Sequence, residues 1–423
     1  MWRARTRRTG AQPQGRAVTA STEPWPSSRL EALRAVGDDE MDALLTPLHG
    51  MTREKIFELY LAFVRAQLDL DPNVWPSELI AWWNRQDVLP PWVDRQKIER
   101  AVDFAEQWLP ELLGMYLLDS LPTAYAGAKG AVVLNRISLL REQSSLMRRV
   151  LETLLFVLRA NERGGLEPGG PGLDLARKTR VFHGLVRVML TRFSVDVREP
   201  TGVGKSWDSE SGLPVNQEDL LGTLWTFSIT PIERLERSGA TISDEDKDAV
   251  IHLWCVVGHL LGIGTDASTP LPMTYAEAAH CWARIQEHQF KPSPEGQNLT
   301  AVLIARCREL VPVPGLRGLP SAAIHDNLGT QVSACVGVAR PGPIRYVLRL
   351  GNAIFWISLR VPGGRLLRIP LRHLLKRFVG EWLRLERLAG RPAITLPEAQ
   401  RRRLVPFYLG PKARSTFPAR SGR

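Results

Sequence analysis

Apolar side chains recur every three or four residues along most of the chain, which is the spacing of one face of an α-helix. This pattern predicts amphipathic helices over residues 30–48, 53–70, 94–118, 136–159 and 173–191. Strict alternation of apolar and polar residues is scarce, and only the stretch 346–359 could compete as a strand or hairpin. The sequence therefore predicts an all-α protein with one large helical domain.

Capping residues indicate where several helices begin. Asn216 precedes an acidic first turn and an apolar run, and Ser243 precedes three acidic residues, so both are typical N-caps. We also expect a helix to begin at Thr230, because Pro231 suits the first helical position and a capping box follows. The glycine- and proline-rich residues 164–172 predict the turn between two long helices.

Length and composition are typical of a soluble globular protein with a large core, at 423 residues, 44% hydrophobic and 23% charged. No apolar run reaches the roughly 18 residues that a membrane-spanning helix needs. The basic N-terminus has no apolar segment behind it and therefore does not resemble a secretory signal. The four cysteines form no CxxC pair, which indicates isolated buried thiols rather than a metal site. We expect a cytoplasmic protein.

The chain carries a formal net charge of +11, and the excess is concentrated at its two ends. We therefore expect a disordered basic arm (residues 1–28), a helical domain (29–395) and a flexible basic tail (396–423). No nucleic-acid motif or basic stripe with interleaved aromatic residues accompanies this charge, so we expect no nucleic-acid partner. Peripheral contact with an anionic membrane stays open, because residues 366–378 combine basic and apolar side chains.

Arg180, His183 and Arg187 share one face of the predicted helix over residues 173–191. A neutral imidazole between two guanidinium groups suits an anionic planar cofactor, since the imidazole can bind iron while the arginines meet propionates. Gly184 would let a flat ring approach this helix closely. Spacing alone favours a different interpretation, in which His183 is a core histidine bonded to a carbonyl group and the arginines lie on a solvated edge.

Arg149 and Thr153 project together from the preceding predicted helix, with Glu152 on the same turn. A guanidinium and a hydroxyl group that face a haem could position O₂ or a substrate. The same spacing would also suit an ordinary pair on a helix surface.

His183 lies 30 positions after Thr153, within a series of helical motifs. The motifs are RRVLETLLFVLR (148–159), KTRVFHGLVR (178–187), PVNQEDLLGTLWTFS (214–228) and Trp-x₃-Gly-His-Leu-Leu-Gly-Ile (254–263). Over residues 121–385 the chain resembles the family of haem oxygenases that contains MpaB and the latex-clearing proteins.

This resemblance implies an all-helical fold around a single buried, non-covalent haem b, with O₂ as co-substrate. It implies His183 as the proximal iron ligand and places Arg149 and Thr153 beside the haem. Latex-clearing members cleave the double bonds of polyisoprene with O₂, and fungal members cleave a prenyl side chain. The expected function is therefore oxidation of an apolar, unsaturated substrate, with isoprenoids as one candidate class.

Glu152 departs from the family pattern. Latex-clearing proteins have a lysine at this position that can bind the distal side of the iron. A carboxylate is a poor ligand for ferrous haem but a plausible acid or base beside O₂. Because an export signal is not apparent either, we expect a small lipophilic substrate rather than an external polymer.

Two other functions stay open at this point. The first is a haem-binding or gas- or redox-sensing protein without catalysis, which the exchange to Glu152 would allow. The second is a membrane-surface scaffold whose helices have lost the cofactor, with residues 366–378 lying on anionic lipid.

Overall fold

The computed structural model describes residues 23–65, 74–85, 89–139, 145–192, 207–264, 271, 274–311, 313–362, 364 and 366. Over these ranges the regular structure is helical, apart from an isolated bridge between Gly127 and Phe290, so the all-α prediction is confirmed. The predicted basic tail and the segment 367–395 lie outside the described residues, as do residues 1–22 of the predicted arm. The last residues of that arm belong to the fold, because Trp25 is buried.

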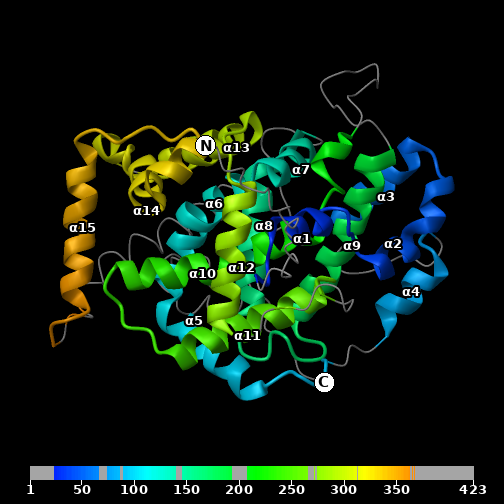
Figure 1. Ribbon diagram of the computed structural model, residues 1–423, viewed down its shortest axis with the longest axis horizontal. Coiled ribbons are helices and arrows are strands. Elements are labelled where there is room, and N and C mark those ends of the chain that lie inside the picture. Colours follow the sequence, from blue (N-terminus) through cyan, green and yellow to red (C-terminus); the bar gives the residue numbers. More distant parts are fainter. Residues whose placement is uncertain are drawn as a thin grey trace, which may run out of the picture.

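Short helices form the N-terminal part of the molecule. They are α1 (Ser27–Leu33), α2 (Asp39–Leu45), the 3₁₀ turn η1 (Thr46–Gly50), α3 (Arg53–Arg65) and α4 (Ser77–Asn84). This part begins near the centre of Figure 1 with α1 and continues on the right with α2, α3 and α4. The single helix predicted over residues 30–48 is thus broken at its middle. Asp38 has an extended backbone there, and its side chain accepts a hydrogen bond from the Met41 amide and caps α2.

The next part of the chain contains long helices together with shorter elements between them. They are α5 (Arg95–Met115), the π-turn η2 (Tyr116–Ser120), α6 (Leu121–Tyr125), α7 (Ala128–Leu139), α8 (Ser145–Ala160) and α9 (Pro171–Arg192), of which α5, α8 and α9 are the long helices. The turn predicted over residues 164–172 separates α8 from α9, and the two helices pack against each other. This pairing brings together the two segments that carry the predicted site residues.

The remaining helices complete the core and its C-terminal side. They are η3 (Ser209–Ser211), α10 (Gln217–Arg237), α11 (Asp244–Leu260), α12 (Tyr275–Gln289), α13 (Pro294–Glu309), η4 (Pro314–Leu316), α14 (Leu319–Cys335) and α15 (Ile344–Ser358). Asn216 and Ser243 cap α10 and α11 as predicted. The predicted helix start at Thr230 is wrong, because α10 continues through Pro231. The turns around Pro231 are buried on all sides, and this packing offsets the backbone hydrogen bond that proline cannot donate.

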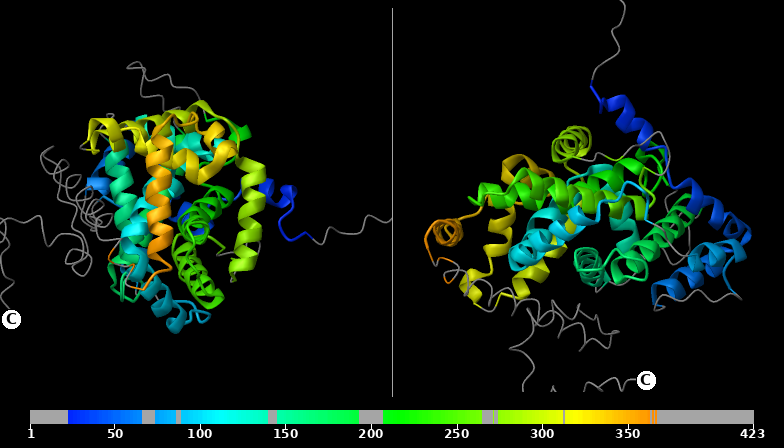
Figure 2. Two further views of the ribbon diagram at one scale, coloured as in Figure 1. Left: turned by 90° about the vertical axis from the view of Figure 1, so that its left-hand side faces the viewer. Right: turned by 90° about the horizontal axis from the view of Figure 1, so that it is seen from below.

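The centre of the core lies where α10 and α11 cross α5. Phe227 of α10 stacks there on Trp254 of α11 with ring centroids 6.0 Å apart, and Trp225 of α10 is fully buried. The stretch 346–359, which could have formed a strand, lies within and just beyond α15 at the left edge of the molecule (Figures 1 and 2). Among the described residues, none of the helices has the length and apolar character needed to cross a membrane.

A buried carboxyl group, that of Asp119, lies in η2 against α10 and α14. Asn327 Nδ2 donates a hydrogen bond to Asp119 Oδ1 (2.6 Å), and Arg234 Nε lies 3.9 Å from Asp119 Oδ2. Burial raises the pKa of Asp119 to about 6, although the Arg234 charge and the Asn327 hydrogen bond oppose the rise. Asp119 therefore makes the fold sensitive to pH.

We predict that Asp119→Asn changes how stability depends on pH between 3.8 and about 6. In this window the folded wild type binds more protons at Asp119 than the unfolded chain, so its free energy of unfolding falls as pH rises. The variant should lose this contribution, which is at most about 3 kcal/mol over the window. Urea unfolding of both proteins across the window measures it, and parallel pH profiles would contradict the prediction.

Candidate functional site

His183 lies near the middle of α9, with its imidazole partly buried beside Phe182. Its Nδ1 atom is buried and has no hydrogen-bond partner. Buried ring nitrogens normally donate or accept a hydrogen bond, because leaving one unpaired costs about 1–3 kcal/mol. His183 Nδ1 therefore does not make the hydrogen bond to a carbonyl group that a structural core histidine would make. His252 of α11 is such a histidine, since its Nε2 accepts a hydrogen bond from the Asp94 amide (2.8 Å).

The surroundings of His183 keep its imidazole neutral. Burial, together with the positive charges of Arg187 and Arg149, lowers the pKa of His183 to about 3. The neutral ring is the form that binds a metal ion. An unpaired, neutral imidazole at this position thus has the chemistry of a metal ligand.

Arg149 reaches this histidine from α8. Its guanidinium lies over the ring of Phe182, and the distance from Arg149 Cζ to the ring centroid is 5.4 Å. Glu152 and Thr153 follow on the next turn of α8, and both side chains are partly buried. The structure therefore brings Arg149 and His183 together through the packing of α8 on α9. The roles expected for Glu152 and Thr153 stay predictions.

Arg180, one turn before His183, forms a buried ion pair with Asp38 at the start of α2. Arg180 Nε and Nη2 donate to the two carboxylate oxygens of Asp38 at 2.6 and 2.7 Å, and Glu40 lies 3.0 Å from Nη2. Gly262 closes over this pair, because a Cβ atom there would lie 2.2 Å from Asp38 Oδ2. Arg180 is thus paired with carboxylates in the structure, and its expected contact with a propionate stays a prediction.

Arg187, one turn after His183, is anchored in a similar way. Its Nε donates to Asp42 Oδ1 (2.7 Å) and its Nη1 to the Val215 carbonyl (3.1 Å). Its Nη2 atom is buried and has no hydrogen-bond partner. The two arginines therefore tie α9 to α2, and only Arg187 keeps a buried donor for an anionic ligand.

Gly184 does not make room for a flat ring, so that prediction was wrong. A Cβ atom on Gly184 would lie 2.5 Å from Leu45 Cδ1 and 2.8 Å from Met41 Cγ. The glycine instead allows α2 to pack closely on α9. The face of α9 that carries Gly184 therefore meets protein.

A second buried polar cluster was not predicted from the sequence. Arg34 Nη1 donates to Glu218 Oε2 and Asp219 Oδ1, both at 2.9 Å, and His288 Nδ1 lies 2.6 Å from Glu218 Oε1. Glu218 is fully buried, and burial raises its pKa while Arg34 and His288 oppose the rise. The acidic first turn of α10 indicated a helix cap, and nothing local indicated partners from α1 and α12.

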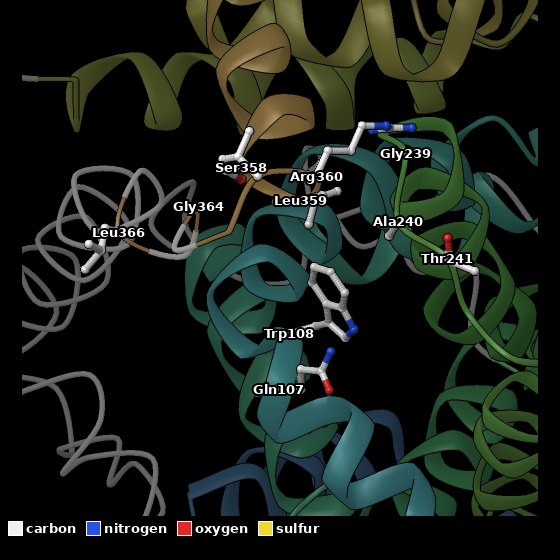
Figure 3. Close-up of a pocket in the computed structure, with 11 residues that line it drawn as sticks. Gln107, Trp108, Gly239, Ala240, Thr241, Ser358, Leu359, Arg360, Gly364 and Leu366 are labelled. Carbon is white, nitrogen blue, oxygen red and sulfur yellow. The ribbon is translucent and has the colours of Figure 1, made fainter.

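A groove of about 540 Å³ opens at a distance from these helices (Figure 3). It is lined by Trp108 of α5, by the turn at Gly239 and Ala240, and by the C-terminal end of α15 with Arg360. None of its lining residues comes from α8 or α9. The groove is therefore separate from the surroundings of His183.

We predict that Asp38→Ala lowers the free energy of unfolding by about 3 kcal/mol, because it leaves a guanidinium buried with only the half-exposed Glu40 as partner. Asp103→Ala is the matched control, since it removes an exposed ion pair with Arg163 and should cost less than about 1 kcal/mol. Urea unfolding of both variants measures the difference. Equal losses in the two variants would contradict a structural role for the Asp38–Arg180 pair.

Comparison with known proteins agrees with this arrangement of helices. Residues 108–403 match the family described as the catalytic domain of ER-bound oxygenase mpaB/B′ and rubber oxygenase. A rubber oxygenase from Streptomyces sp. (strain K30) is 24% identical over 344 residues, which cover 78% of each chain. The solved structure of latex clearing protein in the closed state has the same fold, with a TM-score of 0.65 and 20% identity over 88% of this chain and 98% of that one. The chain thus belongs to the mpaB and rubber oxygenase family of oxygenases.

Proposed function

We propose that this protein is a haem b-dependent oxygenase that uses O₂ to oxidise an apolar, unsaturated substrate. The observation that carries the proposal is His183, a neutral imidazole whose buried Nδ1 lacks a hydrogen bond. Membership of an oxygenase family supplies the class of reaction.

The residues around His183 fit a haem. An imidazole is a common axial ligand of haem iron, and the low pKa of His183 keeps it in the ligating form. Arg187 offers its buried and unpaired Nη2 to a propionate. Arg180 would need to open its pair with Asp38 to do the same. We therefore assign a propionate contact to Arg187 first.

A haem bound at His183 would supply the iron centre that activates O₂. The protein would contribute charge, orientation and a group that can hold a proton. Arg149 holds a positive charge beside the imidazole and would stabilise negative charge as it develops on oxygen. Glu152, three residues along α8, would hold or move a proton at its carboxylate, and the hydroxyl of Thr153 would orient the reacting molecule.

The proposed substrate is a lipophilic molecule with carbon–carbon double bonds. The similar Streptomyces protein is named for rubber, which is a polyisoprene. A series of ring contacts leads from Phe57 through Tyr60 and Phe182 to His183, with the first pair stacked and the next two tilted, and gives this side of α9 an apolar character. A small isoprenoid fits the proposal, and an assay of O₂ uptake with isoprenoids of different length tests it.

We predict that the purified protein, reconstituted with haem if necessary, shows a Soret band that His183→Ala loses. His325→Ala, which removes a partly buried histidine of α14, is the control and should keep the band. Because the pKa of His183 is about 3, the wild-type band should persist as pH falls below 6.5. Absence of a Soret band in the reconstituted wild type would refute the proposal.

We also predict that Glu152→Gln lowers O₂-dependent product formation about 100-fold or more while the Soret band stays. The amide keeps the size of the side chain but cannot transfer a proton. Glu162→Gln, just after the end of α8, is the matched control, because its partly buried carboxylate pairs with Arg159. An unchanged rate would remove Glu152 from the mechanism. A haem-loaded wild type that consumes no O₂ with any isoprenoid would instead indicate a haem-binding protein without catalysis.

A further inference from the structure

The outer face of α15 is apolar and exposed. We give this name to the exposed apolar side chains that recur every three or four residues along one side of the helix: Tyr346, Val347, Leu350, Ile354 and Ile357. Leu350 at the centre is 63% exposed. Figure 2 shows α15 at the edge of the molecule, seen along its axis in the right-hand view. A contiguous apolar surface of this kind commonly marks an interaction site.

The outer face of α15 does not take part in the contacts that hold this helix against the rest of the protein. Its opposite side, with Leu348, Asn352 and Phe355, is the less exposed one, and α14 packs against the helix. Asn352 bonds Asp326 of α14 (3.4 Å), and Phe355 reaches the core. The exposed side chains are therefore additional to those that hold the helix in place.

The sequence segment that contains α15 carries charges of one sign. Between residues 327 and 380 the sequence has no aspartate or glutamate, and nine basic residues. They are Arg340, Arg345, Arg349, Arg360, Arg365, Arg368, Arg372, Lys376 and Arg377. The first four are described by the structure, and none of these four forms an ion pair with a described residue. Such a long stretch without acids favours an anionic partner.

Aromatic side chains flank the apolar face together with arginines. The Arg360 guanidinium lies 3.7 Å from the ring centroid of Trp356, and Arg345 lies 4.9 Å from that of Tyr346. Trp356 is 46% exposed. Tryptophan and tyrosine with neighbouring cations are typical of helices at the boundary between lipid headgroups and acyl chains. The groove in Figure 3 opens at the C-terminal end of α15, beside Arg360.

We propose that the outer face of α15 docks the protein onto an anionic lipid bilayer, with the helix lying parallel to the membrane surface. The apolar side chains enter the boundary of the acyl chains, and the arginines meet lipid phosphates. A second copy of the chain fits less well, because pairing two such helices would bring arginine against arginine without an acid to neutralise them. This docking is independent of haem binding at His183.

The test uses the full chain and vesicles of phosphatidylcholine, with and without phosphatidylglycerol. We expect co-sedimentation with the anionic vesicles, which weakens from about 0.1 M to about 1 M salt. Arg349→Gln should lower the binding constant about fivefold. Leu350→Glu should abolish binding, whereas Val313→Glu, an equal change at another exposed apolar residue, should not.

A fluorescent label locates the contact. All four cysteines are buried, so Leu350→Cys and Val313→Cys each add one accessible thiol for an environment-sensitive dye. The dye on position 350 should shift to the blue with anionic vesicles, and the dye on position 313 should not.

Three results would overturn the proposal. They are equal binding to neutral vesicles, retained binding by Leu350→Glu, and a dimer in sedimentation that Leu350→Glu dissociates without any vesicle binding. The last result would assign the face to a second copy.

Discussion

The buried ion pair between Asp38 and Arg180 fixes how three helices meet. Asp38 caps α2 and accepts hydrogen bonds from Nε and Nη2 of Arg180 on α9. Gly262, in the turn after α11, lies directly against this pair. At this point Gly262 has a φ of +82°, and no side chain would fit. A buried charge without its partner is costly, so this pair excludes other registers of α9 against α2 more strongly than apolar contacts would. Arg187 and Asp42 repeat the constraint two turns further along α9.

This frame also sets the chemistry of His183. The ring lies between the two anchored arginines, so its place on α9 is determined by contacts on the neighbouring turns. Arg187 takes part in both effects, because its pair with Asp42 holds the helix and its charge lowers the pKa of His183. Arg187 thus has a structural role through its contacts and also keeps the imidazole of His183 neutral through its charge. Removing it would disturb position and protonation together.

Local patterns predicted the helices, their capping residues and His183 as a candidate, because periodicity and caps depend on residues close in sequence. They could not reveal the partner of Arg180, since Asp38 lies 142 positions away. Glu218 was hidden for the same reason: its position in an acidic first turn indicated a cap, and its contact with Arg34 is 184 positions distant. Pro231 was misread because burial, which a local pattern does not show, stabilises the helix around it. The resemblance to an oxygenase family, now shown by the match over residues 108–403, supplied what spacing alone left open.

The arginines of this protein fall into two groups with different environments. Arg34, Arg180 and Arg187 are buried, and each has a carboxylate from a distant helix. Arg345, Arg349 and Arg360 lie on or beside α15 in a stretch without acids. Had the second group served only solubility, interspersed acids would have done so at less electrostatic repulsion. Their accumulation beside exposed Leu350 and Trp356 is instead what a headgroup layer would neutralise, because it offers negative charge and apolar depth within one helix diameter.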